Sequence, residues 1–329
     1  MCRPRDEELP SGIVAVHGRA CVTSWTARWV RLALCFAIPV GLAATAATAS
    51  AHGVAGQRFF PTTFAVDDPF MNDEFSVLLH SIEMNGEAGG PRVRTTSLDM
   101  GYSKRIFPGF GLQLDEQYLW LRTAGNGTAR GFGNLAATLK YQFLTSGAHE
   151  TILSVGVSDE LGGTGSARVG AESFSTISPT LFFGKGLGDL PLGYLRPLAI
   201  TGVVGPSFPT QGTTEGVKNP TTLTWAFTVQ YSLMYLQSAV KDIGLGAPFN
   251  RLVALVELPL QTCLNADCGG RTTWTVNPGI AWIGKYMELG AAAEISVNTQ
   301  AGADIGVFVL LHLFIDDLFP GGVGRPIFP

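Results

Sequence analysis

The most constraining feature of this chain is an alternation of apolar and polar residues that is sustained over strand-length segments. In residues 222–236, alternate positions are Leu, Trp, Phe, Val and Tyr, and the positions between them are mostly Thr, Gln and Ser. Successive side chains of a β-strand point to opposite faces, so this segment predicts a strand with one apolar and one polar face. A strand that crosses a membrane as part of a β-barrel needs about 9–11 residues of this pattern.

Twelve segments with this alternation can be identified after residue 73, and an even number is typical of bacterial single-chain barrels. In one of them, 110–122, Glu116 falls on the face of Leu112 and Leu114; a β-bulge would re-aim it, and the alternative is that this strand is misread. The clear segments are 132–144, 222–236, 271–283 and 286–298, and the weaker ones are 74–85, 93–105, 110–122, 150–159, 172–184, 194–205, 250–261 and 303–315.

The polar faces favour a membrane barrel over a soluble sandwich or a lipocalin-like barrel. They carry Thr, Ser, Gln, Asn and Gly, and only 15% of the whole chain is charged, whereas about 25% is average for a soluble domain. Open strand edges cannot exist in hydrocarbon, so the sheet must close on itself. We therefore predict an all-β fold, a transmembrane antiparallel β-barrel of about 12 strands spanning 74–315, followed by a C-terminal tail at 316–329.

The N-terminal residues predict export. Arg28 and Arg31 precede an uncharged apolar run, and Ala49-Ser50-Ala51 fits the small-residue pattern that signal peptidase accepts. We expect residues 1–51 to be a cleaved signal peptide, with His52 as the new N-terminus; an uncleaved anchor helix is the alternative. The acidic stretch before Arg28 is unlike a signal peptide and indicates a translation start further downstream.

The connections between the predicted strands indicate which end of the barrel faces outward. Short turns at 108–109, 146–147 and 284–285 alternate with longer polar links at 123–131, 160–171, 206–221 and 262–270. With both termini in the periplasm, the longer links lie outside. Cys263 and Cys268 fall in one of them and predict a local disulfide, a metal site being the alternative. The inner connections 185–193 and 237–249 are longer than periplasmic turns usually are.

One strand also carries a family resemblance. Residues 131–143 read Gly-Phe-Gly-Asn-Leu-Ala-Ala-Thr-Leu-Lys-Tyr-Gln-Phe. This resembles the GxGDLxLxxKYxF strand of a family of Gram-negative outer-membrane barrels that are labelled as transporters of the phenol meta-cleavage pathway. Residues 186–190 (Gly-Leu-Gly-Asp-Leu) resemble the first half of the motif. The resemblance implies an outer-membrane barrel, and it is specific for the type of barrel rather than for the substrate.

Strand parity predicts which polar side chains face the lumen. Acids outnumber the single Lys among them, so an open lumen would prefer cations or neutral solutes to anions. The alternative is that these groups pair across the lumen and maintain the barrel shape. The predicted pore-lining residues are Asp99, Gln113, Asp115, Gln117, Lys140, Gln142, Gln230, Glu257, Glu288 and Glu294. Parity also places His312 in the lumen and His80 on the lipid side, and large lumen residues such as Phe308 and Leu310 could block a narrow barrel.

The segment 52–73, before the first strand, is unusually aromatic for an exposed tail. We expect a periplasmic segment that folds back as a plug gating the lumen; the alternative is a lead-in that packs against the barrel base or a partner. The candidate plug residues are Arg58, Phe59, Phe60, Phe64, Asp67, Asp68 and Phe70.

These features together predict an outer-membrane channel or transporter for a small solute, with hydrophobic or aromatic solutes as the expected class. The alternative is a structural or surface-interaction barrel with a closed lumen. No Gly-x-Ser-x-Gly, HExxH or phosphate-loop motif follows residue 51, so we expect no enzyme activity, no metal and no cofactor. The expected partners are outer-membrane lipid, the barrel-assembly machinery and an unidentified solute, and no basic patch predicts nucleic-acid binding.

Overall fold

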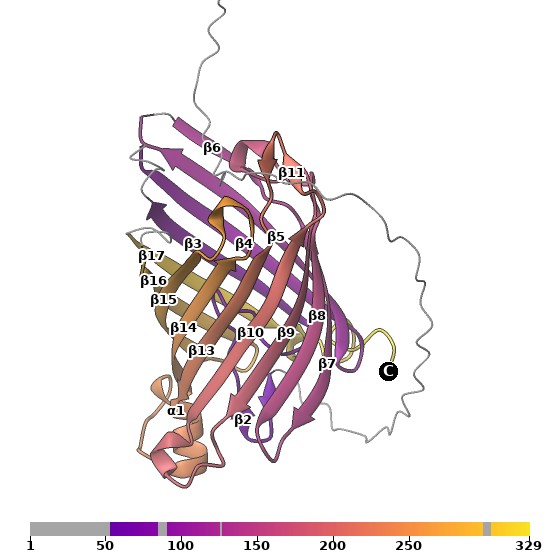
Figure 1. Ribbon diagram of the computed structural model, residues 1–329. Coiled ribbons are helices and arrows are strands. Elements are labelled where there is room, and N and C mark those ends of the chain that lie inside the picture. Colours follow the sequence, from indigo (N-terminus) through magenta and orange to yellow (C-terminus); the bar gives the residue numbers. More distant parts are fainter. Residues whose placement is uncertain (1–52, 85–90, 126, 299–303) are drawn as a thin grey trace, which may run out of the picture.

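The computed structural model describes residues 53–84, 91–125, 127–298 and 304–329, and the predicted signal peptide lies outside this part of the chain. Within the described residues, thirteen strands form one sheet that closes on itself (Figure 1). They are β3 (Glu74–Met84), β4 (Val93–Phe107), β5 (Phe110–Thr123), β6 (Gly127–Phe132), β7 (Ala136–Ser146), β8 (Thr151–Glu160), β9 (Thr176–Gly186), β10 (Leu198–Pro209), β13 (Thr222–Ser232), β14 (Leu252–Cys263), β15 (Thr272–Ile283), β16 (Met287–Ser296) and β17 (Ile305–Phe314).

The barrel is closed by its first and last strands. β3 pairs antiparallel with β17, from Val307 opposite Ser81 to Phe314 opposite Glu74, and apart from β6 and β7 the strands pair in chain order around the wall. β6 and β7 both pair with β5 and together occupy one position of the wall. The result is the predicted antiparallel barrel with twelve strand positions. We call the end with residues 73 and 315 the base, and the opposite end the mouth.

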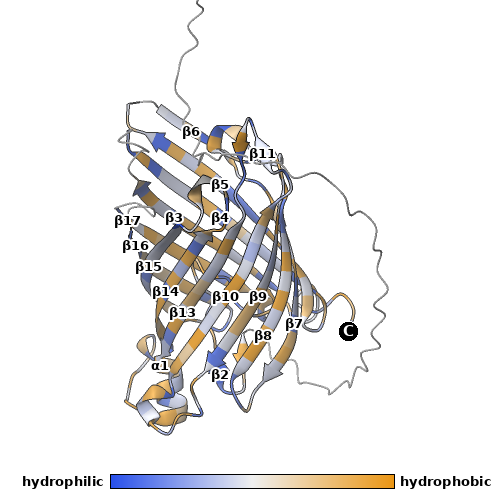
Figure 2. Cartoon of the chain, viewed as in Figure 1, coloured by the Kyte–Doolittle hydropathy of each residue, from blue (hydrophilic) through white to orange (hydrophobic). Residues whose placement is uncertain are grey.

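The outer surface of the barrel is apolar, as the alternation predicted. Along β17, Val307 and Val309 are 53% and 52% exposed, whereas Phe308 and Leu310, which point inward, are 5% and 3% exposed. Apolar and polar residues alternate in the same way along the strands in Figure 2. A wall that exposes so many large apolar side chains requires a lipid environment. Among the residues that the structure describes, no helix has the length and hydropathy of a membrane-spanning helix.

The predicted bulge in the segment around Glu116 was wrong, because the irregularity lies in the neighbouring strand. β5 is continuous, and three residues, 133–135, between β6 and β7 face only two residues of β5, 116 and 117. The expected strand 132–144 is interrupted at this point. Two further register shifts occur near the base, in β4 between Arg105 and Phe107 and in β7 between Gln142 and Leu144.

Other differences concern the strand ends. The expected strand 222–236 stops at Ser232, whose hydroxyl oxygen accepts a hydrogen bond from the Tyr235 amide and caps a short helix, α1 (Leu233–Tyr235). Tyr235 therefore turns away from the outer apolar face and becomes buried. β9 and β10 begin only at Thr176 and Leu198, because residues 172–175 and 194–197 belong to the preceding connections.

His80 lies inside the barrel and not on the lipid side. It belongs to the same inward-facing row of β3 as Ser76 and Leu78, its ring stacks on Phe308 at 4.3 Å between centroids, and its Nε2 lies 2.6 Å from the Glu294 carboxylate. Leu78 and Ile82, which share this inward row with His80, are apolar, so in the sequence the row resembles a lipid-facing one. His312 does face inward, as expected, and is fully buried.

The remaining elements lie at the two ends. β1 (Val54–Ala55) and β2 (Arg58–Phe59) form a small hairpin at the base, and β11 (Thr213–Thr214) and β12 (Val217–Lys218) form another at the mouth. After β17 the chain continues through α2 (Ile315–Leu318) along the base, where the Ile327 and Phe328 amides donate hydrogen bonds to the carbonyls of Arg105 and Ile106.

Candidate functional site

Residues 53–73, which we call the inner segment, run inside the barrel. They enter at the base, rise to residues 64 and 65, whose amides contact Glu257 in the middle of β14, and return to the base at the start of β3. Their apolar side chains occupy part of the lower lumen and form three clusters with the inward faces of the strands. The clusters are formed by Phe64 with Val253, Leu255, Ala281, Ile283, Ala292, Phe308 and Leu310; by Ala55, Phe60 and Phe70 with Ile152 and Ala199; and by Val66 with Phe182, Val203 and Ala226.

Arg58 fastens the rising part of the inner segment to the base. Its guanidinium is 1% exposed, donates to Glu150 at 3.1 Å and to the carbonyl oxygens of Arg196 and Pro197, and lies 3.8 Å from the centre of the Tyr235 ring. Burial lowers the pKa of Arg58, and the Glu150 carboxylate acts in the opposite direction. An arginine satisfied on so many sides holds its position far better than a single ion pair would.

Two buried acids hold the rising part of the inner segment and its highest point. Glu257, on β14, accepts hydrogen bonds from the amides of Phe64 at 2.7 Å and Ala65 at 3.0 Å, and Glu288, on β16, accepts one from the amide of Thr62 at 3.1 Å. The Phe64 ring packs over Gly290, where an added Cβ would lie 2.8 Å from the ring. Glycine at this position therefore makes room for the aromatic ring.

The descending part is held by β7 and β8. Lys140 is 1% exposed, and its ammonium donates to the Asp67 carboxylate at 3.2 Å and to the Asp68 carbonyl at 3.1 Å. The hydroxyl of Ser154 donates to the carbonyl of Pro69, and the Met71 amide donates to the Gln142 side chain at 3.2 Å. The wall thus binds the backbone of this segment as well as its side chains.

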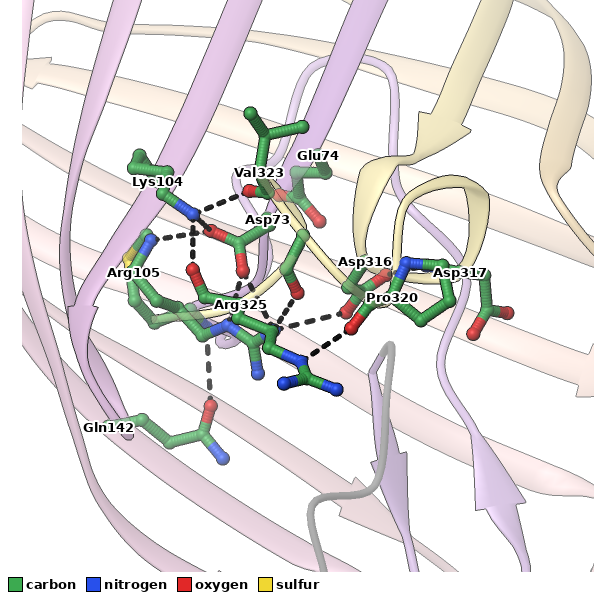
Figure 3. A network of polar contacts seen from close by, with 12 residues as sticks. Asp73, Glu74, Lys104, Arg105, Gln142, Asp316, Asp317, Pro320, Val323 and Arg325 are labelled. Atoms are coloured by element: carbon green, nitrogen blue, oxygen red, sulfur yellow. Dashed lines mark hydrogen bonds and ion pairs between the residues drawn. The ribbon is translucent and has the colours of Figure 1, made fainter. Parts of the chain in front are cut away.

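At the base, Asp73 joins the inner segment to the wall and to the C-terminal tail (Figure 3). It has no exposed surface and accepts hydrogen bonds from Lys104 at 2.9 Å and from the backbone and side chain of Arg105, each at 2.8 Å. Lys104 also donates to the carbonyls of Val323 and Arg325 at 2.6 and 2.5 Å. Asp73, together with Lys104, therefore connects the inner segment, β4 and the C-terminal tail.

A cavity of about 1600 Å³ lies above the inner segment. Its floor includes Phe64, Ala65 and Asp67, and its lining extends to Pro91 and Thr123 at the mouth. Residues 167–173 of the β8–β9 connection also line it and cover part of its upper side. The cavity also extends down beside the inner segment to Glu74, Ser103 and His312 near the base, so the inner segment fills only part of the lower lumen.

The predicted pore-lining residues separate into two groups. Asp99, Gln113, Asp115 and Gln117 line the cavity. The others also point inward, but they are covered, because the inner segment or a neighbouring side chain lies against them. Lys140, Gln142, Glu257 and Glu288 bind the inner segment as described; Gln230 is 2% exposed and donates to Thr201 at 3.4 Å; and Glu294 binds His80.

All of the candidate plug residues lie within the barrel. Phe60, Phe64 and Phe70 are buried, Phe59 is packed edge-on against Phe314 with 6.1 Å between centroids, and Asp68 is 6% exposed. Asp67 is the exception, because 41% of its side chain is exposed to the cavity. Asp67 thus presents a carboxylate to whatever occupies the cavity.

The lining of the upper cavity is acidic. A second cavity of about 490 Å³ adjoins it and shares Asp67, Asp115, Glu160 and Glu172 with its lining; many hydroxyl groups also line this cavity, and neither Lys nor Arg does. Acidic rings in a pore favour cations. Nearer the mouth, Arg130 and Arg168 also line the cavity and partly offset this charge.

Sequence reasoning missed the β8–β9 connection as part of the site. The connection docks on the interruption between β6 and β7, where the Asn134 side chain accepts a hydrogen bond from the Gly165 amide at 3.0 Å and donates to the Glu172 carbonyl at 3.0 Å. A Cβ on Gly131 would lie 2.7 Å from Ser166. The glycines and Asn134 of the Gly-Phe-Gly-Asn sequence were a usable signal, because such residues permit this close approach.

The other site predictions concern cysteines and metals. The structure joins Cys263 and Cys268 by a disulfide in the β14–β15 connection at the mouth, with 5.7 Å between the two Cα atoms. Within the described ranges, no group of three His, Cys, Asp or Glu residues is arranged to hold a metal ion.

Comparison with known proteins identifies the class of fold. No protein-family model matches the chain, and no curated protein matches its sequence. A crystal structure of an outer membrane channel from Pseudomonas putida F1 superimposes with a TM-score of 0.50 at 11% identity, covering 78% of this chain and 99% of that one. The KdgM porin (TM-score 0.41, 12% identity) and the NanC porin (0.45, 8%) each cover 73% of this chain and 98% of their own. The chain therefore has the fold of outer-membrane β-barrels.

Proposed function

We propose that the protein is an exported channel or transporter of the bacterial outer membrane, and that the inner segment is a plug that closes its lumen. The observation that carries this proposal is the way in which the segment is held. Glu257 and Glu288 of the wall accept hydrogen bonds from backbone amides of the segment. Lys140 of the wall donates to the Asp67 carboxylate and to the Asp68 carbonyl. Polar contacts of this kind can be exchanged for water when a segment moves, whereas an entirely apolar core would resist hydration.

The lining of the cavity is suited to a small solute that is neutral or cationic. Acids and hydroxyls dominate the upper lining, and apolar residues such as Leu78, Leu119 and Leu121 lie beside them. A neutral solute with an apolar or aromatic part would find both kinds of contact.

The alternative is a structural barrel whose lumen stays closed. It is favoured by the three apolar clusters, which bury Phe60, Phe64, Val66 and Phe70 of the inner segment and so stabilise the closed state. The two functions differ in whether the inner segment ever moves out of its position in the lumen, and this can be measured.

The test is single-channel conductance in a planar lipid bilayer. The exported protein is compared with a variant lacking residues 53–70, which retains Asp73. We expect stepwise currents in both proteins, and larger currents after the deletion, because the lower lumen is then empty. Heat-modified gel mobility verifies that each barrel is folded. A folded deletion variant that passes no current would overturn the channel proposal.

A reversible lock provides a second test that does not remove the apolar clusters. Val66 and Ala226 belong to one cluster, so a disulfide formed in the double variant Val66→Cys/Ala226→Cys would tie the inner segment to β13, and gel mobility without reductant shows whether it has formed. We expect oxidation to suppress the current and reduction to restore it. Because reduction also opens the Cys263–Cys268 disulfide, the single variant Val66→Cys under the same reductant is the matched control. Equal currents in the locked and reduced states would favour the structural alternative.

A further inference from the structure

Two connections at the base are much longer than the tight turns around them, and both are folded. Residues 187–197 link β9 to β10, and residues 233–251 link β13 to β14; together we call them the basal lobe. Gln237 ties the longer connection together, since its side chain donates to the Leu245 carbonyl at 2.9 Å and accepts from the Leu245 amide at 3.0 Å. An added Cβ on Gly193 would lie 3.2 Å from Val240, so the two connections pack against each other.

The basal lobe is fixed to the wall on both sides. The Arg251 guanidinium donates to the carbonyls of Ile283 and Gly284 at the β15–β16 turn. At the other side, the Tyr231 hydroxyl donates to the Tyr194 carbonyl at 3.2 Å, and the Ser232 amide donates to the Pro197 carbonyl at 3.1 Å. The lobe therefore has a defined position beneath β10, β13 and β14 (Figure 1).

The surface of the basal lobe is unexpectedly apolar. Leu192, Tyr194 and Phe249 are 64%, 58% and 61% exposed, and Leu195 and Ile243 are also exposed. Several large apolar side chains on one ordered lobe indicate a surface that meets something other than water.

This apolar surface continues the lipid-facing band of the barrel. Tyr194 is bonded to Tyr231, which belongs to the same outward row of β13 as the exposed Val229. On the other side of the base, Phe107 stacks with Phe328 and with Phe110, at 5.3 and 6.4 Å between centroids. Aromatic side chains at the end of the apolar band are typical of the membrane–water interface.

We propose that the basal lobe lies in the boundary between headgroups and acyl chains of the periplasmic phospholipid monolayer, with Tyr194 and Phe249 as its aromatic anchors. The inference rests on the membrane location of the barrel. Lipid is the occupant because the exposed residues extend a surface that already faces lipid. The lobe also supplies Tyr235 and the carbonyls of Arg196 and Pro197 that hold Arg58, so the same structure anchors the inner segment at the level of the membrane surface.

The test is the accessibility of a nitroxide spin label in the exported protein, reconstituted in phosphatidylglycerol–phosphatidylethanolamine bilayers. Labels are attached to Tyr194→Cys and Phe249→Cys, since both side chains are exposed and their loss should not affect folding. Val256→Cys on the outward face of β14 is the lipid control, and Gly212→Cys in the β10–β13 connection is the aqueous control. The unsubstituted protein shows that the cysteines of the disulfide do not react.

We expect the ratio of collisions with oxygen to collisions with a water-soluble nickel chelate to be several-fold higher at 194 and 249 than at 212, and to approach the ratio at 256. Ratios equal to that at 212 would place the lobe in water and overturn the proposal. Exclusion of both reagents at 194 and 249 would indicate a protein partner or a second copy, and would also overturn it. An aqueous ratio at 256 would instead refute the membrane barrel itself.

Discussion

The carboxylate of Glu257 accepts a 2.7 Å hydrogen bond from the backbone amide of Phe64, and this contact ties the middle of β14 to the highest part of the inner segment. The residues are 193 positions apart in the chain. Glu257 has no exposed surface, so in the closed state its charge is compensated by the amides of the inner segment rather than by water. Side chains that hold the segment are therefore the natural places to alter gating.

Replacement of Glu257 by glutamine should loosen the inner segment. The amide keeps one acceptor oxygen but presents an NH2 group to one of the two donors, and a hydrogen bond to a charged group contributes about 1.5–3 kcal/mol. We expect the channel to open roughly tenfold more often in planar bilayers, since about 1.4 kcal/mol corresponds to a factor of ten. Glu294→Gln is the matched control, because Glu294 also faces inward but binds His80. Equal opening frequencies for both variants would contradict the assigned role.

Asn in place of Asp73 should destabilise the base of the barrel. Asp73 is fully buried between Lys104 and Arg105, and removal of one partner from a buried ionic cluster costs about 3 kcal/mol or more. We expect the folded band in heat-modified gels to disappear at a lower temperature. Glu83→Gln provides the comparison, since it breaks only surface pairs with Arg92 and Arg94, each of which contributes at most about 1 kcal/mol. A native unfolding temperature for Asp73→Asn would show that the cluster contributes little.

The seating of the inner segment should depend on pH through Asp68. Burial raises the pKa of Asp68 to about 8, and the Glu74 carboxylate also raises it, whereas Lys140 lowers it. An exposed aspartate has a pKa of about 3.9. The seated segment therefore binds this proton more tightly than the released one, and its stability falls as the pH rises from about 4 to about 8.

We accordingly expect more frequent channel opening at about pH 9 than at about pH 5. Asp68→Asn should flatten this dependence, because the amide does not titrate. The measurement is open probability against pH for both proteins. If the native protein and Asp68→Asn show the same pH profile, another group governs the effect.

Charge selectivity should follow the acids of the upper cavity. Asp115 lines the cavity on β5 together with Asp67, Glu160 and Glu172. We expect the deletion variant lacking residues 53–70 to prefer potassium over chloride, and Asp115→Lys in the same background to shift the reversal potential toward that of chloride. Glu83→Lys, which changes the charge by the same amount but belongs to the outward row of β3, should leave the reversal potential nearly unchanged. Identical shifts for both would mean that the selectivity arises from net charge alone.

The fold could be predicted from the sequence because lipid and lumen impose a local pattern. Each strand, such as β15 with Trp274 and Trp282 on one face, shows its two environments in its own residues, and the closed antiparallel barrel follows from the need to pair every edge. Errors arose where a local residue overrode the pattern. Ser232 ended β13 by capping a helix, and the interruption between β6 and β7 explains the misplaced bulge at Glu116.

The sequence by itself determined the class of fold, the inward direction of Glu257, Glu288 and Lys140, and the unusual apolar character of residues 53–70. Only the tertiary structure decided what those residues contact. The alternation within one strand is enough to show which face a residue occupies. The hydrogen bonds between Glu257 and Phe64 and between Glu288 and Thr62, in contrast, join positions 193 and 226 residues apart. Such contacts depend on how the inner segment enters the closed barrel, and no local pattern specifies that path.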